Sequence, residues 1–143
     1  METVTIQKLA KTSQDSFALA QQYYSILSTL NSLNLTEREI QLIAFAAIRG
    51  SISYATVREE FCHKYDSSFP TINNIVSKLK RNHIFVKQGK QIVVNPSIAL
   101  DFSKPLVLQI TLTLNEKRTN GETNEHASEG IPYKKAESKV EHY

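Results

Sequence analysis

The sequence predicts a mainly helical fold with one small antiparallel β-sheet, in the α+β class. Four stretches of the 143-residue chain repeat apolar residues with the spacing of amphipathic helices. After Asn82 the period changes to that of β-strands, and two short extended runs flank Gly89. With 41% apolar residues, a chain of this length buries one core. We therefore expect one compact domain with extensions.

Composition indicates a reducing compartment and no membrane span. Cys62 is the only cysteine, which excludes an intrachain disulfide and a multi-cysteine zinc site. The N-terminus lacks the apolar core of a signal peptide, and no run approaches the roughly 18 apolar residues of a membrane helix. We expect a bacterial or host cytoplasmic location and no membrane partner.

The first predicted helix covers residues 14–32. Its apolar side chains spread over about half of the helix circumference, whereas packing on a single core needs a stripe of roughly 100°. Two interpretations stay open. The surplus width is a second contact surface, such as one for another subunit, or the helix is wedged between two parts of its own fold.

The second predicted helix, over residues 36–49, has the clearest start signal. Thr36 is followed three residues later by Glu39, the pattern of a capping box. Gly50 ends the helix, because glycine tolerates the left-handed conformation that closes many helices. Apolar residues on nearly all of its sides predict that this helix is the buried centre of the fold.

The third predicted helix covers residues 54–65. Residues 51–53 before it are too few for more than a bridge of strand or a turn, and the Ser53 hydroxyl is placed to cap the helix. The inward face is apolar and includes Phe61, while Arg58 is expected to stay in solvent.

The fourth predicted helix follows a turn of three residues. Ser68 or Phe69 caps it, and Pro70 lies in its first turn, where the missing amide hydrogen costs nothing. Its core side is one apolar face, made of Ile72, Ile75, Val76 and Leu79. The helix ends before Asn82.

A β-hairpin follows, with strands at residues 84–87 and 90–94, a minimal turn at Gln88-Gly89 and an end at Asn95-Pro96. The order of three helices and a hairpin over residues 35–98, together with the stretch LKRNHIFVKQGKQIVVNP, resembles the winged helix-turn-helix domain. The chain is similar to MarR-type regulators and to small plasmid- or phage-encoded replication and regulatory proteins.

Beyond the hairpin, apolar residues alternate cleanly from Pro105 to Leu114, which predicts a β-strand about ten residues long. Its partner is the wing sheet, a copy of itself or another protein. From Glu116 the chain is polar and mixed in charge, so composition predicts a flexible tail unless a partner holds it. The expected units are an N-terminal extension with an amphipathic helix (1–34), the winged helix-turn-helix domain (35–100), the additional strand (101–115) and the tail (116–143).

The resemblance implies a DNA-reading face. In a winged helix-turn-helix domain the last helix enters the major groove, while its end and the wing contact phosphates. Opposite the apolar face of that helix lie Asn74, Ser77 and Arg81, flanked by Asn73 and Lys78. Asn can bond adenine and Arg can bond guanine through paired hydrogen bonds, and Ser suits either base.

Basic residues gather in the same region. Residues 70–90 contain five basic and no acidic residues: Lys78, Lys80, Arg81, Lys87 and Lys90. If all five met phosphates, the salt slope of DNA binding would be about −4 to −5, at about 0.9 per contact. The net charge of the whole chain is only +3, so a solvated helix face without a ligand stays the alternative.

No residue pattern is typical of an enzyme or a metal site. Cys62 and His63 are adjacent, a poor geometry for one metal, and no second pair has ligand spacing. The chain has no glycine-rich phosphate loop, nucleophile elbow or paired carboxylates in a plausible cleft. We expect no enzymatic activity, no metal and no cofactor.

The leading hypothesis is a sequence-specific protein that binds double-stranded DNA, regulates transcription or replication, and dimerises through residues 14–32 or 105–114. The alternative is a winged-helix protein-interaction module that forms a structural or assembly component of a larger complex, such as a phage particle, with a location in the virion. The weak net charge, the wide apolar face of the first helix and the partnerless strand favour this alternative.

Overall fold

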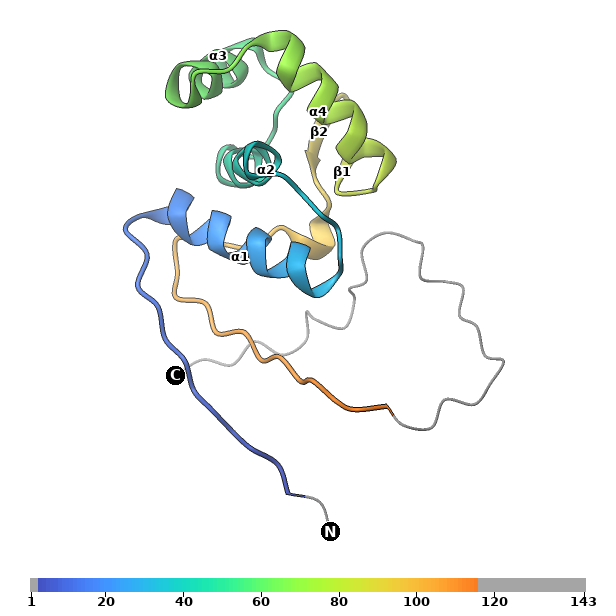
Figure 1. Ribbon diagram of the computed structural model, residues 1–143. Helices are drawn as coiled ribbons and strands as arrows, with labels where there is room; N and C mark the ends of the chain where they lie inside the picture. Colours follow the sequence, from blue (N-terminus) through green and yellow to red (C-terminus); the bar gives the residue numbers. More distant parts are fainter. Residues whose placement is uncertain (1–2, 116–143) are drawn as a thin grey trace, which may run out of the picture.

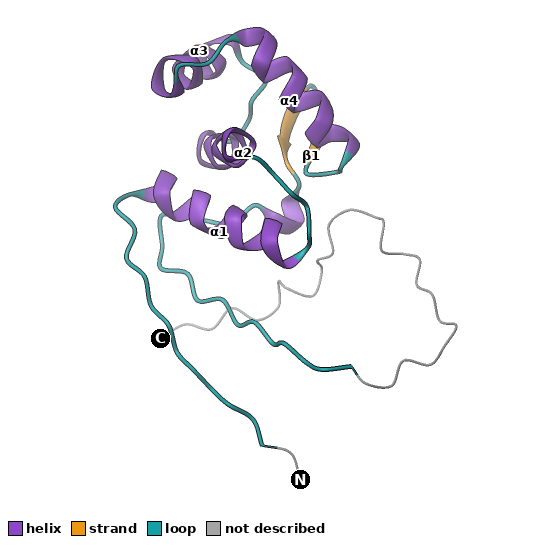
Figure 2. Ribbon diagram, in the orientation of Figure 1, coloured by secondary structure: helices purple, strands orange, loops and turns teal. Residues whose placement is uncertain are grey.

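The computed structural model describes residues 3–115, and the predicted tail at 116–143 lies outside them. Its elements are, in chain order, α1 (Ser16–Leu30), α2 (Glu37–Arg49), α3 (Ala55–Tyr65), α4 (Phe69–Arg81), β1 (Phe85–Gln88), β2 (Gln91–Val94) and the 3-10 helix η1 (Pro96–Ile98). The mainly helical content and the small antiparallel sheet agree with the predicted α+β class (Figure 2). None of the described helices is long and apolar enough to cross a bilayer.

Helix α2 lies at the centre, with α1 on one side and α3, α4 and the hairpin on the other (Figure 1). Its start is the predicted capping box, in which Thr36 and Glu39 each accept a hydrogen bond from the other's amide. Gly50 ends the helix in the left-handed conformation, at φ +92°. The side chains from Leu42 to Ala46 are almost fully buried, so the prediction of a buried central helix is confirmed.

Phe45 of α2 is the centre of an aromatic cluster that joins the first three helices. Its ring packs against three others, those of Phe17, Phe61 and Tyr65, and the stacked pair with Phe17 has centroids 5.4 Å apart. The guanidinium of Arg49 covers the cluster at 5.3 Å from the Phe45 centroid and pairs with Glu60 of α3. The hydrogen bonds that Arg49 donates to the Glu60 carboxylate raise the pKa of Arg49.

Helix α1 is shorter than the predicted 14–32, because Asp15 caps it by accepting a hydrogen bond from the Ala18 amide at 2.8 Å. Its wide apolar face packs against two different parts of the protein. One side packs on α2, and the other is covered by the chain that follows the hairpin (Figure 1).

Tyr24 of α1 makes the tightest of these contacts. Its hydroxyl donates a hydrogen bond to the Ile98 carbonyl at 2.6 Å, and the ring of Phe102 lies 5.7 Å from those of both Tyr23 and Tyr24. Burial raises the pKa of the Tyr24 phenol, which therefore stays a hydrogen-bond donor. Helix α1 is wedged between two parts of its own fold, one of the two interpretations of its wide apolar face.

The prediction that Ser53 caps α3 is wrong. The Ser53 hydroxyl instead accepts a hydrogen bond from the Ile92 amide of β2 at 2.6 Å, and the Ile52 amide donates to the Ile92 carbonyl at 3.0 Å. Tyr54 is the N-cap residue without a side-chain cap. The edge of β2 offers an amide and a carbonyl that need partners, and residues 51–53 supply them.

The hairpin turn lies one residue later than predicted. Gln88 pairs with Gln91, so the two turn residues are Gly89 and Lys90 rather than Gln88 and Gly89. Gly89 has φ +64°, a value that favours glycine in a tight hairpin turn.

The base of the hairpin is attached directly to the end of α4. His83 adopts φ +63°, and its carbonyl accepts a hydrogen bond from the side-chain amide of Asn95 at 2.9 Å. The Ile84 amide donates to the Leu79 carbonyl at 2.9 Å. The chain therefore turns from helix to strand within two residues, which sets the hairpin against α4.

The predicted strand at 105–114 is wrong for the single chain. Residues 105–115 form no backbone hydrogen bond with another described residue, and the described sheet contains only β1 and β2. Leu106 packs against the core, but the side chains from Val107 to Leu114 are exposed. An extended segment becomes a strand only beside another strand, and here none adjoins it.

Candidate nucleic-acid interface

Helix α4 separates apolar from polar side chains as the sequence predicts. Its buried residues are Ile72, Ile75, Val76 and Leu79. Asn74, Ser77 and Arg81 are exposed on the opposite side, and Asn73 and Lys80 are exposed beside them. Ser68, the predicted cap, accepts a hydrogen bond from the Thr71 amide at 3.3 Å.

The hairpin packs against α4 and adds positive charge (Figure 1). Lys87 in β1 and Lys90 in the turn are exposed, and Gly89 between them has no side chain. With Lys80 and Arg81 they make four exposed cations, none of which forms an ion pair with a described residue. Because neither α4 nor the hairpin contains an acidic residue, this surface carries a net positive charge.

Asn73 is held in place by α3. Its Oδ1 accepts a hydrogen bond from Arg58 Nη1, while Arg58 Nε donates to the Ile52 carbonyl at 2.8 Å. The expectation that Arg58 stays in solvent is wrong, because the residue is half-buried and its guanidinium donates to both of these acceptors. Sequence reasoning missed this contact, since nothing in the local pattern of α3 indicates what α4 offers it.

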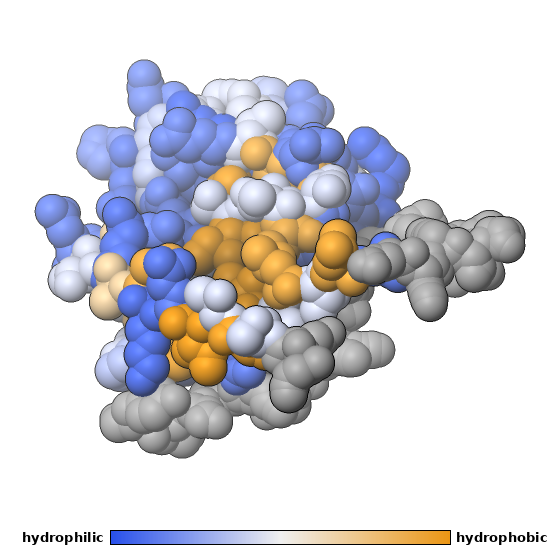
Figure 3. Space-filling view, turned by 60° about the horizontal axis from the view of Figure 1, so that its bottom comes forward, coloured by the Kyte–Doolittle hydropathy of each residue, from blue (hydrophilic) through white to orange (hydrophobic). Residues whose placement is uncertain are grey.

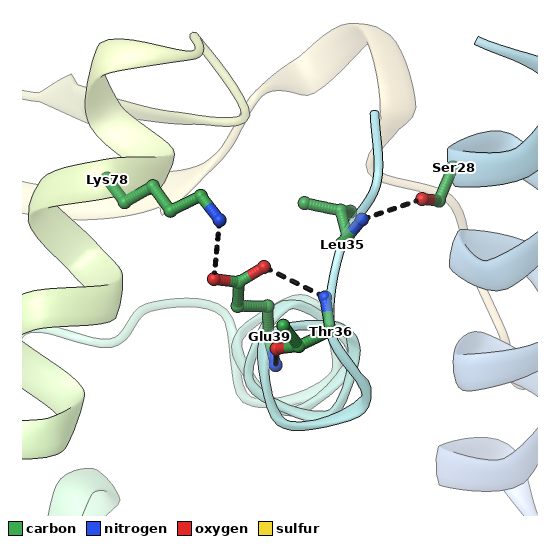
Figure 4. Close-up of polar contacts among 5 residues, drawn as sticks. All are labelled: Ser28, Leu35, Thr36, Glu39 and Lys78. Carbon is green, nitrogen blue, oxygen red and sulfur yellow. Dashed lines mark hydrogen bonds and ion pairs between the residues drawn. The ribbon is translucent and has the colours of Figure 1, made fainter. Parts of the chain in front are cut away.

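Lys78 points to a partner inside the protein (Figure 4). Its Nζ donates to Glu39 Oε2 at 2.8 Å, and Glu39 Oε1 accepts from the Thr36 amide at 2.9 Å. Next to this pair, the Leu35 amide donates to Ser28 Oγ at 3.1 Å. The network links α4 to α2 and to the end of α1. Lys78 therefore has a partner within the protein, and the other four basic residues predicted to contact DNA are exposed to solvent.

We expect Glu39→Ala to lower the free energy of unfolding by about 2 kcal/mol, since it removes the reciprocal cap and leaves Lys78 without its acceptor. The expected loss is no larger because the Lys78 side chain is 40% exposed, so that solvent screens its ion pair with Glu39. Urea unfolding monitored by circular dichroism measures the change. Glu37→Ala, at an exposed position of the same helical turn, is the matched control and is expected to cost about 0.5 kcal/mol. Equal losses in the two variants would contradict the role of the network.

The remaining polar candidates form no second site in the described part of the chain. Cys62 is half-buried and His63 is exposed, and residues 3–115 contain no group of three His, Cys, Asp or Glu side chains that could hold a metal ion. No protein-family model matches the chain, and neither the curated proteins nor the solved structures contain a match.

Proposed function

We propose that residues 35–100 are a winged helix-turn-helix domain that binds double-stranded DNA sequence-specifically and regulates transcription or replication. The observation that carries this proposal is the outward face of α4, where Asn74, Ser77 and Arg81 are exposed beside a cationic hairpin. In this reading α3 and α4 are the helix-turn-helix pair, α4 is the recognition helix and β1–β2 is the wing.

Two further features support the proposal. Residues 51–53, which connect α2 to α3, attach to the edge of β2 through the Ile52 amide and the Ser53 hydroxyl. The side-chain amide of Gln91 also donates to the Tyr54 hydroxyl at 2.6 Å, so the hairpin is fixed to the start of α3. A fixed wing and helix present one rigid surface, which reading a duplex requires.

The chemistry assigns separate roles to the exposed residues. Asn74 and Arg81 are the base-contacting side chains, because a carboxamide matches adenine and a guanidinium matches guanine. Lys80, Lys87 and Lys90 contact phosphates, which supply affinity without sequence information. Three cations on phosphates give a salt slope of about −3 at about 0.9 per phosphate, below the value of about −4 to −5 expected if all five basic residues contributed.

The test is selection of a preferred site from a random duplex library, followed by titration of that site and of a scrambled duplex at several salt concentrations. We expect Arg81→Ala to lose about 10- to 100-fold in affinity for the selected site and little for the scrambled one. Lys87→Ala is expected to weaken both equally and to reduce the salt slope by about one unit.

Lys64→Ala is the matched control, because Lys64 belongs to α3 rather than to α4 or the hairpin, and its ammonium lies 4.8 Å from the ring centroid of Phe17 in α1. It removes the same charge and is expected to leave the slope unchanged. Absence of duplex binding at low salt, or an Arg81→Ala protein that selects the same site as strongly, would overturn the proposal. Failure to bind DNA together with a large, defined oligomer would favour the protein-interaction module of an assembly instead.

A further inference from the structure

The exposed apolar side chains of the described residues are concentrated on one side of the molecule. Nine of the eleven large ones belong to three segments, residues 4–9, the last residue of α1 and residues 107–114. Figure 3, which brings the α1 side forward, shows an apolar patch across that face. The two others, Tyr54 and Phe69, lie at the starts of α3 and α4.

The area of this surface lies in the upper part of the range for the largest apolar patch of a typical monomer, about 300–600 Å², and patches of that size are often binding sites. The exposed fractions of the nine side chains are equivalent to about six fully exposed residues, or on the order of 500 Å² of apolar area at roughly 60–120 Å² each. Contiguous apolar patches on monomers are usually a few hundred Å². Because interfaces are about 60% apolar, the area matches the roughly 800 Å² per partner of a standard interface.

Residues 106–114 have the properties of a strand that lacks its neighbour. They consist of Leu, Val, Ile, Thr and one Gln, with no charge, proline or glycine, and their backbone groups form no hydrogen bond within the described chain. Phe102, buried against α1, anchors the segment four residues before it begins. Leu106, the first residue of the segment, packs against the core to which α1 also contributes. The face formed by the even-numbered residues of the segment therefore begins at that core.

We propose that this surface binds a second copy of the same chain, with residues 106–114 of the two copies paired as antiparallel strands around a two-fold axis at Ile110. In this register Leu106 faces Leu114 of the partner, Leu108 faces Leu112 of the partner, and Ile110 faces its own copy. The apolar even-numbered residues of both strands then lie on one face of the pair, and that face packs on helix α1 of each copy. A two-fold interface uses the same patch on both copies.

The absence of charge is the reason for choosing a second copy as the occupant. Like charges directly opposite each other destabilise a strand pair, and a self-pairing strand places many residues opposite their own kind. The sequence LVLQITLTL brings no charge into that arrangement in any register. Two backbones also satisfy each other's amides and carbonyls along the whole segment, which a partner with only an apolar groove does not do.

The decisive variant is Ile110→Asp, tested in the full chain by sedimentation equilibrium at micromolar to submillimolar concentrations. The wild type is expected to be a dimer, and Ile110→Asp is expected to weaken dimerisation about 100-fold or more because two carboxylates meet at the axis. Thr111→Asp is the matched control, since it adds the same charge to the opposite face and meets Gln109 of the partner rather than itself. It is expected to change the dissociation constant by less than about tenfold. The segment is exposed, so all three proteins should keep the same circular dichroism spectrum.

Cysteine crosslinking tests the register independently. In a Cys62→Ser background, Ile110→Cys is expected to form a covalent dimer under mild oxidation, because opposed Cα atoms lie about 4.5–5.5 Å apart. Leu112→Cys should crosslink poorly to itself, since its two copies are separated by four residues, or about 14 Å.

A wild-type monomer over the whole concentration range would overturn the proposal, and it is also the result expected if residues 4–9 pair with the segment within one chain. A dimer that survives Ile110→Asp and does not crosslink at position 110 would overturn it as well. DNA binding does not depend on this result, because a monomer with an intact α4 and hairpin still presents the proposed interface.

Discussion

Phe45→Ala is expected to lower the free energy of unfolding by about 3–5 kcal/mol, a large part of the 5–15 kcal/mol typical of a domain. The Phe45 side chain is fully buried and touches rings from α1 and α3, so its removal leaves a cavity where three helices meet. The neighbouring rings are held by their own helices and cannot collapse fully into that space. Urea unfolding at constant pH and salt gives the loss.

Phe69→Ala is the matched control, because it makes the same chemical change at a side chain that is 37% exposed at the start of α4. We expect it to cost less than half as much as Phe45→Ala. A similar cost at both positions would mean that α2 is not the centre of the core. Phe45→Leu, which keeps most of the volume, should recover most of the stability.

Phe102→Ala is expected to cost about 3–4 kcal/mol and to detach residues 99–106 from α1. Phe102 is 4% exposed and packs on the rings of Tyr23 and Tyr24, on the side of α1 that the chain after the hairpin covers. Unfolding measurements give the loss, and limited proteolysis should show faster cleavage after residue 98 at native conditions. Lys104→Ala, whose exposed side chain lies 3.7 Å from Asp101, is the control and should stay within about 0.5 kcal/mol of the wild type.

Tyr24→Phe separates packing from hydrogen bonding at the same place. It keeps the ring and removes only the hydroxyl that binds the Ile98 carbonyl, so we expect a loss of about 1–2 kcal/mol. If Phe102→Ala were neutral while Tyr24→Phe was costly, the carbonyl contact and not the aromatic contact would be what holds the segment against α1.

The helices and the hairpin were predictable because their signals are local. Thr36 and Glu39 lie within one turn of each other, and Ser68 lies beside the amides that it caps, so the starts of α2 and α4 follow from the sequence alone. The polar face of α4 was predictable for the same reason, since four apolar residues at helical spacing define both sides of a helix.

The partners of individual polar groups were not predictable. The sequence predicts Lys78 as a DNA contact and Arg58 in solvent, yet each has an acceptor on another element, Glu39 for Lys78 and Asn73 for Arg58. Ser53 had a correct local reason to cap α3, but the amide of Ile92 competes for the same oxygen. Such contacts join positions 15 to 39 residues apart, and local pattern carries no information about that distance.

Residues 105–114 show the difference between what the sequence pattern determines and what the tertiary packing determines. Alternation of apolar and polar residues sets which side chains share a face once the backbone is extended, and that property belongs to the sequence. Whether the segment is a strand depends on a second backbone within hydrogen-bonding distance, which the packing of α1, α2 and the hairpin does not provide. The same packing buries one side of α1 under residues 98–106 and leaves the polar face of α4 exposed. The periodicity of the sequence therefore determines which side chains share a face of each helix or extended segment. The tertiary structure decides which of these faces are buried, because burial requires a contact with another element that the local sequence does not specify.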